Sequence, residues 1–188
     1  MFMYKLSLFF NTLRYLKLSQ IFYLIWFRFF KKKSIPICDY NIKVNQNCCL
    51  WTNSIPKPQS VISKNSVVFL FKKARIKQKS NWDKRLSKLW LYNLHYFDDL
   101  NSKNISSRQN KMRLEYINNW IKINNNVNNI AWDSYTISIR IVNLIKWQFT
   151  GISFSQKILK SLFIQTKTLS NNIEYHLLGN HVLANSKA

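Results

Sequence analysis

The residue types best suited to chemistry in this sequence gather around position 180. Asn180 and His181 follow Gly179, one of only two glycines in the chain, and His176 lies a few residues before them. Histidine can act as a base or donate a hydrogen bond near neutral pH, and asparagine can donate a hydrogen bond to a carboxylate. Because glycine adopts backbone conformations that other residues avoid, Gly179 can turn both neighbouring side chains into a cavity. Asn180 and His181 are therefore candidate catalytic residues, although a lone histidine is more often a hydrogen-bonded structural group.

Two earlier clusters contain further residues that could bind a ligand. The first, WLYNLHYFD, includes His95 and Tyr96, and its spacing also fits an aromatic core helix whose polar groups are satisfied locally. The second, WDSYTISIR, includes Tyr135 and Arg140. An arginine in an otherwise apolar helix either pairs with an acid or holds an anion. We predict that these four residues bind a substrate. No spacing typical of a metal site is present, so neither a metal nor a cofactor is expected.

The elements that must position these clusters are helices, because apolar residues recur about every 3.6 residues from residue 82 onward. The apolar faces of three predicted helices are formed by Met112, Tyr116 and Trp120, then by Ile137, Ile141 and Leu144, and then by Ile158, Leu162, Leu169 and Ile173. Their expected caps are Ser107, Asp133 or Ser134, and Ser155, and the second helix should end near Gly151. Short polar connections such as residues 124–129 predict antiparallel helical pairs.

The chain before residue 82 is expected to form two different regions. Residues 1–33 predict a basic amphipathic helix over residues 4–30, closed by Lys31, Lys32 and Lys33. Its longest apolar run is too short to span a bilayer and no cleavage site follows it, so it is either buried or lies on an anionic membrane surface. Residues 34–81 predict an irregular linker with a short strand at residues 66–71, which places the β structure near residues 60–75.

Composition supports a globular, mostly α-helical protein with an extreme charge. A hydrophobic fraction of 47% excludes a disordered chain, and two glycines and three prolines argue against an all-β fold. The net charge of +22 attracts polyanions, although a bias toward Lys, Asn and Ile explains part of it. Cys38, Cys48 and Cys49 are expected to be free thiols or to form one bridge.

Three segments together resemble a known family. WLYNLHYFDDL, WDSYTISIRIVNLIKW and IEYHLLGNHVLANSKA, in this order, resemble the N-terminal part of heparinase II/III-like polysaccharide lyases. The earlier segment TLRYLKLSQIFY resembles the start of uncharacterised members associated with bacterial surface polysaccharide. The resemblance is weakest over residues 35–80. It implies that residues 82–188 form part of an incomplete α/α toroid of antiparallel helical hairpins, which a β-sandwich domain follows in the family.

The resemblance also implies a reaction. Family members cleave acidic polysaccharide by β-elimination at a uronic acid, in which a base removes the proton beside a carboxylate whose charge must be neutralised. By resemblance, Asn180 neutralises this carboxylate and His181 is a second neutraliser or the base. The family's catalytic tyrosine and its sandwich domain are expected beyond residue 188. We therefore expect a truncated lyase that binds acidic polysaccharide and is inactive alone. It is a truncated gene product, one part of a split gene whose sandwich domain is encoded separately, or a binding remnant.

The resemblance places the protein in the periplasm or cell envelope, although the sequence contains no cleavable signal peptide or transmembrane helix. Two other classes of function compete with a lyase fragment. A basic helical protein can bind nucleic acid, but no nucleic-acid motif is present and the cations form no clear stripe. A protein held on a membrane surface through residues 4–33 is the second alternative.

Overall fold

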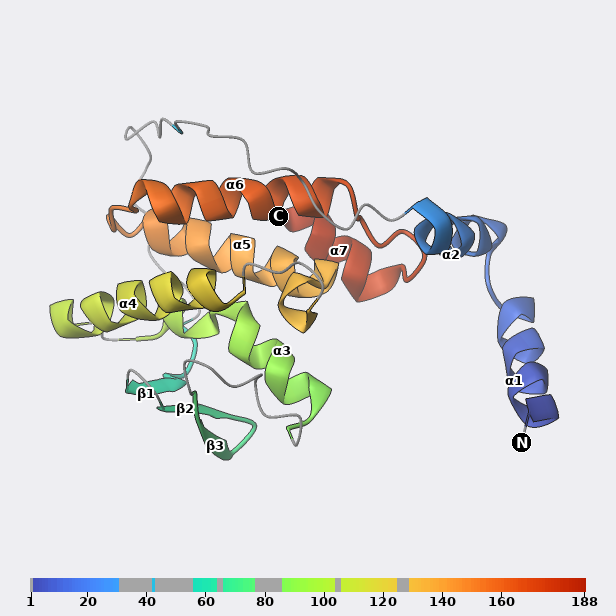
Figure 1. The fold of residues 1–188 in the computed structure, drawn as a ribbon, viewed down its shortest axis with the longest axis horizontal. Helices are drawn as coiled ribbons and strands as arrows, with labels where there is room; N and C mark the ends of the chain where they lie inside the picture. The colour runs from blue at the N-terminus through green and yellow to red at the C-terminus, as the bar shows by residue number, and fades with distance from the viewer. Residues whose placement is uncertain are drawn as a thin grey trace.

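The computed structural model describes residues 2–30, 42, 56–63, 66–76, 86–103, 106–124 and 129–188. Within these residues the protein is mostly α-helical and has a small three-stranded antiparallel sheet (Figure 1). The predicted mostly helical fold is therefore confirmed, and so is the position of the β structure near residues 60–75. The cysteines and Lys31–Lys33 lie outside the described residues. A toroidal arrangement of the helices stays a prediction.

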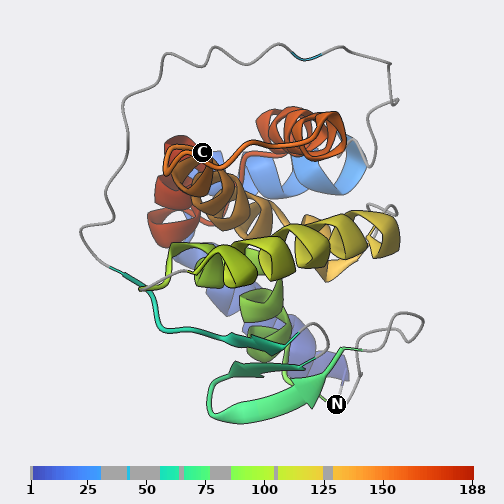
Figure 2. The same ribbon diagram turned by 90° about the vertical axis from the view of Figure 1, so that its left-hand side faces the viewer.

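The described helices, in chain order, are α1 (Phe2–Arg14), α2 (Leu18–Phe30), α3 (Lys88–Tyr96), α4 (Ser107–Ile123), α5 (Ser134–Gln148), α6 (Gln156–Ser170) and α7 (Gly179–Lys187), with short 3-10 helices η1 (Asp98–Asn101) and η2 (Ile130–Trp132). Helix α5 is central, because α3, α6, α7, η1 and η2 all pack against it. Figures 1 and 2 show α6 at one end of this body and the sheet at the opposite end, with α5 and α4 between them. Helices α3 and α7, which carry candidate site residues, are therefore both held on α5.

The sheet is a meander of β1 (Val61–Ser63), β2 (Ser66–Phe69) and β3 (Lys72–Arg75), with β2 in the middle. Phe69 lies edge-on to Trp90 of α3, and the Trp90 indole donates a hydrogen bond to the Lys72 carbonyl at 3.1 Å. The strand predicted to reach Phe71 ends at Phe69. Leu70 and Phe71 have positive φ angles of 50° and 60° and form the tight turn into β3.

The N-termini of α4, α5 and α6 agree with the predicted caps to within one residue, whereas α5 ends at Gln148 rather than near Gly151 and α6 ends at Ser170, before Ile173. Ser106, not Ser107, caps α4: its hydroxyl accepts from the Gln109 backbone, and the Gln109 side chain accepts from the Ser106 backbone. This reciprocal capping box satisfies two amide donors at once, which favours the earlier serine. Asp133 and Ser155 occupy the cap positions of α5 and α6.

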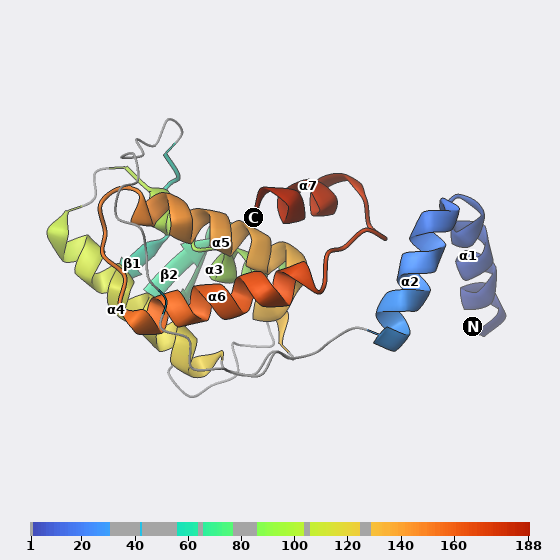
Figure 3. The ribbon, with the colours of Figure 1, turned by 90° about the horizontal axis from the view of Figure 1, so that it is seen from above.

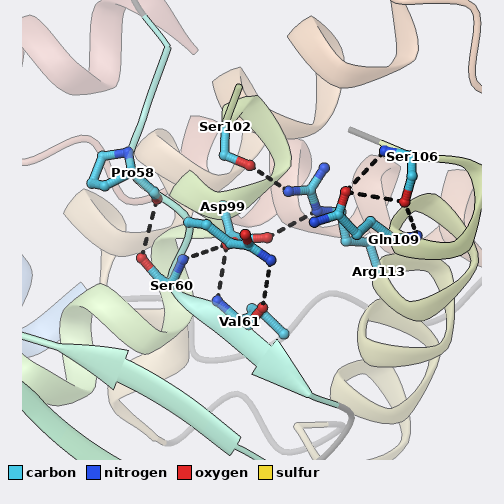
Figure 4. Close-up of polar contacts among 9 residues, drawn as sticks. Pro58, Ser60, Val61, Asp99, Ser102, Ser106, Gln109 and Arg113 are labelled. Carbon is cyan, nitrogen blue, oxygen red and sulfur yellow. Dashed lines mark hydrogen bonds and ion pairs between the residues drawn. The ribbon is translucent and has the colours of Figure 1, made fainter. Parts of the chain in front are cut away.

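A buried ion pair joins the sheet to the helical body (Figure 4). Asp99 in η1 accepts a hydrogen bond from the Val61 backbone at 2.9 Å, and its second oxygen accepts from Arg113 Nε of α4 at 2.8 Å. Ser60 and Ser102 complete the network through the Ser60 amide and the Ser102 hydroxyl. Both charged side chains are almost fully buried. A single carboxylate thus connects β1, η1 and α4.

The amino-terminal region forms two helices rather than the single helix predicted over residues 4–30. Residues 15–17 separate α1 from α2, and α2 contains no buried residue, so burial of this region in the core is wrong. None of the helices that the structure describes is both long and apolar enough to cross a bilayer. Figures 1 and 3 show α1 and α2 beside the body formed by α3–α7.

Replacement of Arg113 by methionine should strongly destabilise the fold. The substitution leaves the Asp99 carboxylate buried without its cation, which costs about 3–5 kcal/mol of unfolding free energy. Denaturant unfolding measures this loss. Arg108→Met is the matched control, because Arg108 is exposed on the same helix and its replacement should change stability by less than about 0.5 kcal/mol. Equal effects of the two substitutions would contradict a structural role for the ion pair.

Candidate functional site

Three helices bring an aromatic face together on the surface of the body. We define the aromatic face as Tyr92 and Tyr96 of α3, Tyr135 of α5 and His181 of α7. The centroids of the Tyr96 and Tyr135 rings are 6.1 Å apart, and the Tyr135 and His181 ring centroids are 4.7 Å apart. Tyr92 stacks on Tyr96 one helical turn away, at 6.3 Å. All four side chains are partly exposed, so their rings and polar atoms are accessible to a ligand.

His181 is held by a carboxylate. Its Nδ1 lies 2.8 Å from Glu174 Oε2, and the Glu174 side chain is more buried than the imidazole. A carboxylate on one ring nitrogen fixes the orientation and the tautomer of an imidazole. The other nitrogen, Nε2, can then accept or donate a proton to a bound molecule.

A turn in the backbone makes this pair possible. Leu178 and Gly179 both have positive φ angles, 54° and 51°, and α7 begins at Gly179. The turn reverses the chain between Glu174 and His181. Asn185 then fixes the segment from within α7, because its side chain accepts from the Glu174 amide and donates to Ser138 Oγ of α5, both at 2.8 Å. The Glu174–His181 pair is therefore anchored on α5 through a buried amide.

Asn180 lies in the first turn of α7 next to His181, and its side chain is exposed. No side-chain hydrogen bond caps this helix end. Backbone N–H groups at a helix N-terminus and the helix dipole favour negative charge. The Asn180 amide is therefore placed where a carboxylate is favoured, although no contact with the aromatic face positions its side chain.

The tyrosines on α3 are proton donors rather than bases. Burial is the main cause that raises the pKa of Tyr92, and the hydrogen bond from its hydroxyl to Asp133 Oδ2 at 2.7 Å adds to it. Burial also raises the pKa of Tyr96, with smaller effects of Tyr135, Tyr92 and Asp98. Both phenols keep their protons near neutral pH. The single Tyr92 proton is already donated to Asp133, so Tyr92 can only accept from a sugar, whereas Tyr96 can donate a hydrogen bond to one.

The carboxylates bordering the aromatic face are each engaged by a neighbour. Lys88 Nζ lies 3.9 Å from Asp133 Oδ2 and 5.2 Å from the Tyr92 ring centroid. Asp98 accepts from the Asn143 amide and lies 3.6 Å from Lys57 Nζ. The contacts in the described part of the chain thus give this face few cations of its own, despite the net charge of +22.

His95 and Arg140 lie in the core, away from the aromatic face. Arg140 is fully buried and donates to the Gln165 side chain and to the carbonyls of His95 and Ala131. His95 is 1% exposed, and its Nδ1 accepts from the Trp120 indole at 3.0 Å. A polymer on the surface does not reach side chains buried in this way. Two of the four residues predicted to bind substrate, His95 and Arg140, therefore support the fold beneath the face instead.

Sequence inspection alone did not single out Glu174, Asn185 or the pairing of Tyr92 with Asp133. Glu174 was noted only as a member of its motif, and Asp133 only as a helix cap. The seven-residue separation of Glu174 from His181 does correspond to two helical turns, but the two residues do not share a helix. The signal present in the sequence is the scarcity of acidic residues. Three of only seven, Asp98, Asp133 and Glu174, border this face.

Comparison of the chain with protein-family models, with curated proteins and with solved structures finds no match. Within the described residues, no group of three or more His, Cys, Asp or Glu side chains could hold a metal ion. The site therefore has to be interpreted from its own geometry.

Acid should weaken the fold through His95. Burial, and then the charge of Arg140, lower the pKa of His95 to about 3. In the unfolded chain the histidine has a pKa of about 6.5, so below this pH it binds a proton that His95 does not bind in the folded state. The stabilising contribution is complete above about pH 6.5 and is lost as the pH falls toward 3, by about 1 kcal/mol per pH unit.

Denaturant unfolding as a function of pH checks this slope. His95→Gln is the comparison variant, because a glutamine side chain can still accept the Trp120 hydrogen bond but does not titrate. The variant should show a flatter decline on acidification than the wild type. Parallel declines would assign the acid sensitivity to other groups.

Proposed function

We propose that this chain binds acidic, uronate-containing polysaccharide on the aromatic face, as the helical part of a heparinase II/III-like lyase. The observation that carries the proposal is the Glu174–His181 pair packed against Tyr135, with Tyr96 beside it. Tyrosine rings provide flat apolar surfaces with polar edges, which suit the alternating faces of a sugar. The toroidal arrangement of the helices and the cell-envelope location belong to the same proposal.

The groups on this face match the needs of β-elimination. The base removes the proton on the carbon beside the uronate carboxylate, the electron pair forms a carbon–carbon double bond, and the glycosidic oxygen leaves and takes a proton. His181 Nε2, with Nδ1 held by Glu174, is suited to be the base. Tyr96, which keeps its proton, can donate a hydrogen bond to the sugar. The catalytic acid in this proposal is the family's tyrosine, outside these residues, so this chain should bind the polymer without cleaving it. Asn180 and the N-terminus of α7 favour the carboxylate.

Carboxylate neutralisation on this face relies on dipoles more than on cations. The only nearby lysines that the described contacts place at the border, Lys57 and Lys88, already lie close to Asp98 and Asp133. The remaining positive charge of the chain attracts the polymer over longer distances, in a way that salt screens. We therefore assign affinity to the overall charge and orientation of the sugar to Asn180, His181 and the tyrosines.

The binding prediction compares polymers and site variants. The chain should bind alginate and heparin more tightly than duplex DNA at near-physiological salt, and the affinity should fall as salt is raised. Asn180→Ala and His181→Ala should each weaken alginate binding about tenfold, which corresponds to ~1.4 kcal/mol. Asn11→Ala is the matched control, since Asn11 is an exposed asparagine on α1, a helix that contributes no residue to the aromatic face.

Isothermal titration or fluorescence anisotropy measures these affinities. A clear preference for DNA would instead favour the nucleic-acid function that the charge also allows. Unsaturated uronates absorb in the ultraviolet, so the same samples report elimination. Product formation that survives both Asn180→Ala and His181→Ala would contradict the roles given to these residues.

A further inference from the structure

The outer surfaces of α1 and α2 expose far more apolar area than the rest of the described chain. Their exposed large apolar side chains are Tyr4, Leu8, Phe9, Phe10, Tyr15, Leu18, Phe22, Leu24, Ile25, Trp26, Phe29 and Phe30. A high density of exposed apolar side chains on one pair of helices is typical of an interaction site on a protein. Figures 1 and 3 show both helices at one end of the molecule, where the α3–α7 body does not cover them.

An aromatic ladder runs along the exposed side of α2. We define the aromatic ladder as Phe22, Trp26 and Phe30, which are spaced four residues apart and so share one helical face. Phe22 and Trp26 stack with ring centroids 6.1 Å apart, and Trp26 and Phe30 stack at 4.5 Å. About half or more of each side chain is exposed. Three adjacent rings thus face away from the protein.

A neighbouring side of α2, about a quarter-turn around the helix from the ladder, is already used for attachment to the body. Gln20 donates a hydrogen bond to the His176 carbonyl at 3.1 Å, Tyr23 packs on Tyr175, and Phe27 packs on His176. These contacts hold α2 with the aromatic ladder turned outward. The ladder is therefore not an apolar face waiting to fold onto its own domain.

The charge of residues 2–30 indicates whether this surface binds a second copy of the chain or an anionic lipid surface. Residues 2–30 contain Lys5, Arg14, Lys17 and Arg28 and no acidic residue at all. Two copies of the chain that met through these helices would bring like charges together without a carboxylate to pair them, at a net charge of +22 each. An anionic lipid surface supplies both the missing negative charge and an apolar layer for the rings.

We propose that α1 and α2 form a docking surface for anionic phospholipid membranes. Trp26 and the phenylalanine rings enter the boundary between headgroups and acyl chains, where amphipathic aromatic side chains are favoured. Arg14, Lys17 and Arg28 lie among them and contact lipid phosphates, with their apolar stems along the membrane. The helices lie on the membrane rather than cross it. This surface is separate from the aromatic face and does not depend on polysaccharide binding.

Vesicle co-sedimentation of the full chain tests the proposal. Vesicles of equal parts phosphatidylglycerol and phosphatidylcholine should bind the protein, and vesicles of phosphatidylcholine alone should bind it far less. Replacement of the aromatic ladder by Phe22→Ser, Trp26→Ser and Phe30→Ser should weaken binding by about tenfold or more. The matched control replaces three exposed apolar side chains elsewhere, Ile62→Ser, Phe71→Ser and Leu89→Ser, and should leave binding unchanged.

A second set of variants distinguishes binding through this surface from the general attraction of a basic protein to anionic vesicles. The variant Arg14→Gln, Lys17→Gln and Arg28→Gln should weaken binding on the order of 100-fold. Its control removes three exposed cations from β3, as Lys72→Gln, Lys73→Gln and Arg75→Gln, with the same change in net charge. That control should lose only a few-fold.

Circular dichroism checks that each variant is folded. Any one of three outcomes would contradict the proposal. Equal losses in the two charge variants would assign binding to net charge alone. Full binding by the ladder variant would exclude insertion of the rings. A ladder-dependent dimer that does not sediment with vesicles would make the surface a contact between copies of the chain.

Discussion

The fold of the helical body depends on a buried guanidinium that no carboxylate contacts among the described residues. Arg140 projects from α5 and donates to Gln165 of α6 and to the carbonyls of His95 and Ala131, at the end of α3 and in η2. Its guanidinium also lies 4.2 Å from the centroid of the Trp120 ring of α4. Burial lowers its pKa to about 9, so it stays charged near neutral pH. A buried cation of this kind is tolerated only when every neighbour is in place, and this requirement fixes the spacing of four helices around α5.

The same constraint decides which residues can meet a ligand. Because Arg140 and the neutral His95 fill the interior side of α5 and α3, the remaining faces of these helices carry Tyr135 and Tyr96 outward, beside His181 of α7. Asn185 extends this order to the loop before α7 by joining Glu174 to α5. Polar groups in the core therefore position the aromatic face, although they do not form part of it.

Periodicity in the sequence was enough to predict α4, α5 and α6 and the short β segment, because both signals are local. The predicted N-terminal caps were correct to within one residue for the same reason. Periodicity did not predict α7, and it extended the third helix to Ile173, whereas α6 ends at Ser170. Spacing around His95 also fitted an aromatic core helix with a satisfied polar group, which is the role that the structure gives this residue. The role of Arg140 was not predictable from spacing, since burial depends on how α4, α5 and α6 pack. The pairing of Glu174 with His181 depends on a turn at Leu178 and Gly179, and only the glycine gave any warning of it. The break between α1 and α2 was also missed, because residues 15–17 contain neither glycine nor proline.

One short segment connects the two surfaces of the molecule. Residues 174–176 contact α2 through Tyr175 and His176, while Glu174 holds His181 on the aromatic face. Contacts to α2 and the carboxylate that orients the imidazole therefore belong to three consecutive residues. The same segment is tied to α7, because the Glu174 amide donates to Asn185 and the turn at Leu178 and Gly179 returns the chain to His181.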